Sequence, residues 1–201
     1  SHGGVAVIAN IRGGGEFGPR WHQAALKGNR HKAFEDFIAV AEDLIARKYT
    51  AKDHLGIMGG SNGGLLVGAA MTMRPDLFKA VVCQVPLLDM QRYNKLLAGA
   101  SWMAEYGNPD IPEQWAFIKT WSPYHNVREK VNYPHALFIT STRDDRVHPG
   151  HARKMVARLA ALKQPVWYYE NMEGGHSTAT NNKQRAFMRS LEMAFLWKML
   201  K

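Results

Sequence analysis

A glycine-flanked serine at residues 59–63, Gly-Gly-Ser-Asn-Gly, constrains this chain more than any other feature. The residues before it, 54–58, favour a strand, and those from Gly64 to about Met73 favour a helix. A G-x-S-x-G pattern at such a junction puts the serine on a sharp, strained turn, where glycines let neighbouring backbone approach closely. Because the same pattern occurs in ordinary glycine-rich turns, Ser61 is a candidate nucleophile whose role depends on its partners.

A nucleophilic serine needs a base that takes its proton and an acid that orients the base, here expected in the chain order Ser, Asp, His. The apolar run 136–140 predicts a buried strand and is followed by Asp144 and Asp145. A further predicted strand, 166–169, leads into a glycine-rich loop that carries His176. Each residue alone could be a solvated loop residue or, for the aspartates, a helix cap. Their joint occurrence at one sheet edge predicts a serine hydrolase.

The composition is typical of one globular domain, with 46% hydrophobic, 10% aromatic and 21% charged residues in 201. The single cysteine, Cys83, lies in an apolar run and is expected to pack in the core, so it leaves the compartment open between cytoplasm and periplasm. No run reaches the length of a membrane helix, and we expect no membrane partner. Since the chain does not begin with methionine, we expect its natural N-terminus to be missing or processed.

The net charge of +9 raises the question of nucleic acid, but the basic residues are scattered rather than gathered in one run. We therefore expect no nucleic-acid partner, and read the charge as facing either an acidic substrate mouth or an acidic partner segment. His148 and His151 lack a further ligand at metal-binding spacing, so no metal is predicted. The glycines after Arg12 lack the Gly-Lys-Ser/Thr ending of a phosphate loop, and no cofactor is expected.

The order of predicted elements indicates a parallel sheet covered by helices. A strand near residues 4–10 and a helix near residues 32–48 precede the elbow, and a strand around Val82 follows it. Further helices are predicted at 150–162 and 183–200. The helix near 32–48 has one apolar stripe, formed by Phe34, Phe37, Ile38, Ala41, Leu44 and Ile45. An aromatic-rich insertion between Leu87 and Val131 interrupts the pattern and is the candidate for determining specificity.

Several longer motifs resemble those of the prolyl oligopeptidase family. They cover the chain almost from end to end and are Asn-Ile-Arg-Gly-Gly-Gly-Glu-Phe-Gly at 10–18, Gly-Gly-Ser-Asn-Gly-Gly at 59–64, Arg-Pro-Asp-Leu-Phe at 74–78, Ser-Pro-Tyr-His-Asn-Val at 122–127 and Asp-Asp-Arg-Val at 144–147. The resemblance implies an α/β-hydrolase fold with a mostly parallel sheet flanked by helices. It also implies that residues 1–201 form part of a peptidase catalytic domain, incomplete at its N-terminal side.

The resemblance implies a serine-type endopeptidase or oligopeptidase that hydrolyses short peptides on the carboxyl side of proline through an acyl-enzyme. Ser61 resembles the nucleophile, Asp144 the triad acid and His176 the base, which leaves Asp145 as a neighbour. Asn62 resembles the residue whose backbone N–H serves the oxyanion hole.

Four further residues resemble the substrate-binding set of the family. Arg146 resembles the arginine that holds a substrate carbonyl, and Trp102 and Tyr106 resemble an aromatic wall against which the proline ring stacks. Val147 is an apolar neighbour. Without the motif, a tryptophan in this position would be read as a core or interface residue.

The family's β-propeller, its early strands and its second oxyanion donor, a tyrosine hydroxyl, have no counterpart in this chain. One strand is expected to be missing between the predicted strand at Val5 and the elbow strand. We therefore expect a fragment that pairs with a preceding segment or another subunit, and that alone is less active than a complete enzyme. Alternatives are an oligopeptidase B-like enzyme that cuts after Arg or Lys, suggested by Glu105, an acylaminoacyl peptidase, a general esterase, or a noncatalytic, self-associating piece.

Overall fold

The computed structural model describes residues 3–201 and contains a four-stranded parallel sheet whose spatial order, β1-β2-β3-β4, follows the chain. The strands are β1 (Gly56–Gly60), β2 (Ala80–Gln84), β3 (His135–Ser141) and β4 (Val166–Asn171). Because the strands are parallel, the loops after all of them leave the same edge of the sheet. This arrangement is the one expected from the alternation of strand and helix.

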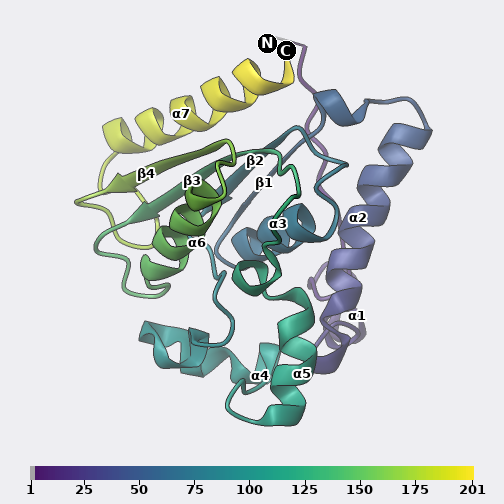
Figure 1. Cartoon of the computed structure of the whole chain (residues 1–201), viewed down its shortest axis with the longest axis vertical. Helices are drawn as coiled ribbons and strands as arrows, with labels where there is room; N and C mark the ends of the chain where they lie inside the picture. The colour runs from purple at the N-terminus through teal and green to yellow at the C-terminus, as the bar shows by residue number, and fades with distance from the viewer. Residues whose placement is uncertain (1–2) are drawn as a thin grey trace.

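Helices cover both faces of the sheet (Figure 1). The α-helices of the described residues are α1 (Pro19–Gln23), α2 (His31–Ala46), α3 (Asn62–Met73), α4 (Met103–Tyr106), α5 (Pro112–Trp121), α6 (Gly150–Ala161) and α7 (Asn182–Leu200). Helices α3 and α6 pack on one face, with α2 against α3, while α7 crosses the other face. The helices predicted near 32–48, 64–73, 150–162 and 183–200 are confirmed with small shifts at their ends. In residues 3–201 no helix combines the length and apolarity needed to cross a membrane.

Strand β2 shows why the sheet needs both layers. Its side chains alternate, so Val81 and Cys83 pack toward α3 and α6 while Ala80 and Val82 pack toward α7. All four are fully buried. Burial raises the pKa of the Cys83 thiol, which therefore stays protonated and serves as a small apolar group.

The insertion between residues 87 and 131 forms short 3₁₀ turns together with α4 and α5, and it packs against α2 and α3. It builds a second core of buried side chains: Phe34, Leu65, Ala69, Leu87, Met90, Tyr93, Tyr106, Ile118, Trp121 and Val147. Within it, the rings of Tyr93 and Tyr106 meet edge to face with centroids 5.6 Å apart. The aromatic residues of the insertion thus serve partly as core.

The strand predicted near residues 4–10 is wrong for this structure, which assigns no strand there. Val5 and Ile8 are each 89% exposed, although both favour strands. The physical reason is the missing neighbour: among the described residues, β1 pairs only with β2, so nothing lies beside residues 4–10 to accept and donate ladder hydrogen bonds.

Candidate active site

The backbone at Ser61 is held in a strained turn between β1 and α3. Its φ of 58° and ψ of −115° are unusual for a residue with a side chain. The Ser61 N–H donates to the Gln84 carbonyl at 2.9 Å, and the Ser61 carbonyl accepts from the Leu65 N–H at 3.1 Å. The first bond ties the turn to β2 and the second begins α3.

Glycine is required on two sides of this turn. A Cβ on Gly59 would overlap the backbone of Gly63, and a Cβ on Gly64 would lie 2.7 Å from the Pro86 side chain. A Cβ on Gly63 itself would meet open space. The close approach of backbone predicted from the motif therefore requires glycine at positions 59 and 64. At position 59 the neighbouring atoms are those of the Gly63 backbone.

The structure brings Ser61, Asp144 and His176 together from the loops after β1, β3 and β4. The His176 Nε2 atom lies 3.0 Å from the Ser61 Oγ, and its Nδ1 lies 2.9 Å from one carboxylate oxygen of Asp144. A carboxylate accepts hydrogen bonds but cannot donate them, so Nδ1 carries the ring proton and Nε2 presents its lone pair to the serine hydroxyl. This geometry lets the ring take the hydroxyl proton.

The Asp144 side chain is completely buried, whereas Asp145 is exposed. The Asp144 Oδ1 atom accepts hydrogen bonds from the backbone N–H groups of Arg146 and Val147, each at 2.9 Å. These bonds fix the carboxylate toward His176 and compensate for the burial of its charge. The loop folds this way because the short Asp side chain caps the turn that its own residue begins.

Asn62 is the first residue of α3, where backbone N–H groups have no acceptor within the helix. Its side-chain Oδ1 accepts from Arg30 Nη2 at 2.6 Å and from the Tyr106 hydroxyl at 2.8 Å. Sequence reasoning did not find Arg30, because an isolated arginine 32 positions away carries no motif. Its 4% exposure is the structural signal.

Two of the predicted substrate residues are buried in the second core. Tyr106 is 4% exposed and Val147 is 2% exposed, so neither presents a wide surface to solvent. Trp102 is half-buried against the same core, and Arg146 is exposed. Burial raises the pKa of Tyr106 to about 12, which keeps its hydroxyl protonated as a donor to Asn62.

Glu105, the carboxylate that suggested a basic-specific enzyme, has two partners inside the fold. One oxygen accepts from Arg30 Nη1 at 2.6 Å, and the other lies 2.9 Å from His22 Nε2. Its negative charge is therefore already compensated by a buried guanidinium. No sequence motif marks the Arg30–Glu105 pair, because its residues lie 75 positions apart.

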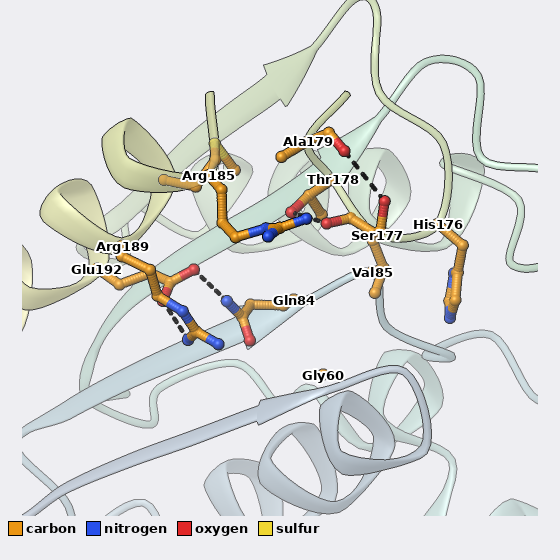
Figure 2. Close-up of a pocket in the computed structure, with 11 residues that line it drawn as sticks. Gly60, Gln84, Val85, His176, Ser177, Thr178, Ala179, Arg185, Arg189 and Glu192 are labelled. Carbon is orange, nitrogen blue, oxygen red and sulfur yellow. Dashed lines mark hydrogen bonds and ion pairs between the residues drawn. The ribbon is translucent and has the colours of Figure 1, made fainter. Parts of the chain in front are cut away.

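A cavity of about 200 Å³ lies on the α7 side of His176 (Figure 2). It is bounded by the ends of β1 and β2, the loop at residues 176–179 and the first half of α7. Arg189 and Gln84 both bond Glu192 in its wall, so α7 is anchored to the sheet there. The polar wall differs from the flat aromatic pocket expected for a proline ring, and Trp102 does not line it.

Within residues 3–201, no group of three or more His, Cys, Asp or Glu side chains converges as a metal site. His151, one of the two histidines considered above, is buried and accepts the N–H groups of Leu88 and Asp89 at 3.2 and 3.0 Å through Nδ1. It acts as a structural acceptor under the loop that follows β2.

Comparison with known proteins adds three similarities. The chain is 57% identical over 198 residues to a peptidase of Sinorhizobium fredii, covering 98% of this chain and 27% of that protein. It is 46% identical over 187 residues to a prolyl endopeptidase of Elizabethkingia miricola, covering 91% of this chain and 26% of that protein. A solved post-proline cleaving enzyme from Rickettsia typhi superposes with a TM-score of 0.91 at 45% identity, over 96% of this chain and 28% of that one.

The chain thus spans about a quarter of the length of the relatives it matches. The superposition identifies the parallel sheet and its helices as an α/β-hydrolase fold of the type in the prolyl oligopeptidases. The family model for the prolyl oligopeptidases matches residues 1–201. This chain belongs to the prolyl oligopeptidase family.

Proposed function

We propose that this chain carries the catalytic triad of a serine peptidase that cleaves short peptides after proline through an acyl-enzyme. The observation that carries the proposal is the unbroken series of contacts from Ser61 Oγ through His176 to the buried Asp144, at 3.0 and 2.9 Å. A strained serine at a sheet edge, oriented by such a pair, is the arrangement that activates a hydroxyl for acyl transfer.

In the proposed reaction, Ser61 Oγ attacks the scissile carbonyl and its proton passes to His176 Nε2. Asp144 holds the ring in the required tautomer and stabilises the imidazolium. The imidazolium then protonates the leaving amine, which leaves the acyl group on Ser61. Water then attacks the acyl carbonyl and gives a proton to His176, and the imidazolium returns that proton to Ser61 Oγ as the acyl–Oγ bond breaks and the peptide acid leaves.

The oxyanion formed in each step needs donors aimed at it. We assign one to the backbone N–H of Asn62, because it directly follows the nucleophile at the start of α3. Such a donor contributes roughly 3 kcal/mol to lowering the barrier.

The preference for proline rests on the relatives, which include a prolyl endopeptidase and a post-proline cleaving enzyme. Trp102 supports it as a half-buried aromatic ring on the insertion, able to hold a rigid uncharged ring. Exposed Arg146 is the proposed donor to a substrate carbonyl. Tyr106 contributes through its hydroxyl on Asn62 rather than as an open stacking surface.

The pairing of Glu105 speaks against cleavage after Arg or Lys. A basic-specific pocket needs a carboxylate free to meet the substrate cation, and Arg30 and His22 already occupy the Glu105 oxygens. A substrate cation that displaced Arg30 from Glu105 would leave a buried guanidinium unpaired, and this costs more free energy than the new ion pair with a solvated cation provides.

The open edge of β1 supports a requirement for further chain. A preceding segment, or a second polypeptide, would pair with β1, cover residues 4–10 and supply the second oxyanion donor. This fits the quarter-length match to the relatives.

The test is hydrolysis of paired chromogenic peptides ending in Pro or Arg, after intact mass has defined the polypeptide used. Ser61→Ala is the control in each assay. Ser61-dependent cleavage after Pro is the expected result, in the longest natural polypeptide that contains residues 1–201. Ser61-dependent cleavage after Arg would move the assignment to the basic-specific branch, and Ser61-independent turnover would overturn it.

A further inference from the structure

We propose that Arg30 is a positioning residue that fixes Asn62, and with it the oxyanion donor, to the substrate-binding insertion. This inference rests on the proposed function above. Arg30 precedes α2, Asn62 begins α3, and Glu105 and Tyr106 belong to α4. One guanidinium therefore joins three elements around the nucleophile.

Arg30 is buried as few arginines are. Its side chain is 4% exposed, with the guanidinium carbon 5.2 Å from the centre of the Tyr106 ring and 5.9 Å from that of Phe34. Removing a guanidinium from water is costly unless its N–H groups find acceptors. The two terminal nitrogens each have an acceptor at 2.6 Å, Glu105 Oε1 and Asn62 Oδ1, while the buried Nε has no hydrogen-bond partner within residues 3–201.

The two acceptors make the contact directional. Arginine can only donate, so Asn62 must turn its amide oxygen toward Arg30, and Tyr106 must donate its hydroxyl proton to the same oxygen. The Asn62 side chain is therefore held by two donors in one rotamer. The peptide plane between Ser61 and Asn62, which carries the proposed oxyanion donor, is fixed from outside the turn.

The tether reaches the substrate side through Glu105 and Tyr106. These residues follow Trp102 by one helical turn, on the insertion that carries the proposed proline site. A planar fork that binds Asn62 with one nitrogen and Glu105 with the other sets the distance between that insertion and the nucleophile turn. Because the oxyanion exists only during the reaction, loss of the tether should reduce kcat more than it raises KM.

The experiment compares Arg30→Met, Arg30→Lys and wild type in the longest natural polypeptide that contains residues 1–201. The matched control is Arg74→Met, which removes an arginine ion-paired with Glu42 and Asp76 at the opposite end of α3. Each variant is assayed for kcat and KM on a Pro-ending peptide, for inhibition by a peptide aldehyde that forms a tetrahedral adduct with Ser61, and for Tm.

For Arg30→Met we expect kcat to fall roughly 10- to 100-fold with KM changed less than about 3-fold, and the aldehyde inhibition constant to rise in step. Arg30→Lys keeps the charge without the planar fork and should recover part of the loss. Arg74→Met should leave kcat and inhibition unchanged.

A lower Tm for Arg30→Met with unchanged kcat and aldehyde affinity would overturn the inference, since it would make Arg30 only structural. A rise in KM alone would also overturn it. If wild type shows no Ser61-dependent cleavage, the proposed function fails and the oxyanion role of Asn62 fails with it. An active wild type with an unaffected Arg30→Met overturns the positioning role alone.

Discussion

Two apolar, glycine-containing segments of this chain, residues 56–64 and residues 4–14, meet different fates. The first enters the sheet as β1 and turns sharply at Ser61, where the Gln84 carbonyl receives the Ser61 N–H at 2.9 Å. The second runs along the surface with Val5 and Ile8 each 89% exposed. The difference lies in their neighbours, because β1 has β2 beside it and residues 4–10 have no strand beside them among the described residues.

The same comparison explains why the nucleophile turn tolerates strain. Ser61 adopts its left-handed φ of 58° between a strand, a helix and the Arg30–Asn62 contact, each of which constrains it. Residues 4–10 lack such constraints, because no strand lies beside them among the described residues. Local sequence therefore predicts what a segment prefers, and the surrounding structure decides whether that preference is realised.

The largest expected effect on activity tests whether the turn at Ser61, in residues 56–64, is catalytic. Ser61→Ala should reduce peptide cleavage by a factor on the order of 10⁴ or more and abolish labelling by a serine-reactive phosphonate. Circular dichroism and Tm should match wild type, because alanine removes only the hydroxyl. A grossly unfolded variant, or labelling that persists, would contradict the role given to Ser61.

The features that the sequence predicts depend on patterns between residues close together in the chain. These features are the apolar stripe of α2, the turn at Ser61, and the positions of Asp144 and His176 in loops that follow strands. The sequence does not predict the contacts of Arg30, because Arg30 and its partners Asn62 and Glu105 lie 32 and 75 positions apart. A motif could mark Tyr106 as part of the site, but only the packing of the second core shows that its ring is buried.

A second prediction contrasts glycines in the two segments. Gly59→Ala should lower the free energy of unfolding by about 3 kcal/mol, because the new methyl group overlaps the Gly63 backbone and neither side can yield without moving the turn. Gly4→Ala adds a methyl group where nothing lies within 4 Å and should change stability by less than about 0.5 kcal/mol. Urea unfolding of both variants measures the contrast, and similar losses at the two positions would refute it.

Acid should lower the free energy of unfolding through protonation of His151, which lies beneath the loop after β2. Burial lowers the pKa of His151 from 6.5 to about 4, and the neutral ring accepts two backbone N–H groups just beyond β2. A lowered histidine pKa means that the unfolded chain binds the proton first, so stability is complete above pH 6.5 and declines as pH falls toward 4. The expected loss between pH 7 and pH 5 is about 2 kcal/mol.

The measurement is urea unfolding of wild type and His151→Asn across that range. Asparagine retains an acceptor but does not titrate, so its unfolding free energy should vary less between pH 7 and pH 5. Equal slopes for the two proteins would assign the acid sensitivity to other groups. The ion pair with Arg153 lowers the pKa of Glu170 from 4.5 to about 2. Protonation of Glu170 therefore adds to the loss of stability only as the pH falls below about 4.5.

The smallest effect is expected at the exposed segment, where it is the most informative about partners. In the 201-residue chain, Ile8→Thr should change the free energy of unfolding by less than about 0.5 kcal/mol, because the side chain is 89% exposed. Ile57→Thr, in β1 and 7% exposed, should cost about 2 kcal/mol. A large cost at Ile8 in the short chain would mean that the segment already packs in a strand.

The same pair of variants then tests the proposed partner of the β1 edge. If a preceding segment or a second polypeptide places a strand between β1 and residues 4–10, Ile8 becomes buried and Ile8→Thr should cost nearly as much as Ile57→Thr. The measurement is therefore repeated in the longest natural polypeptide that contains residues 1–201. A cost that rises there only at Ile8 identifies the missing neighbour as the cause of the difference between the two segments, whereas an unchanged cost would leave residues 4–10 as surface chain in both.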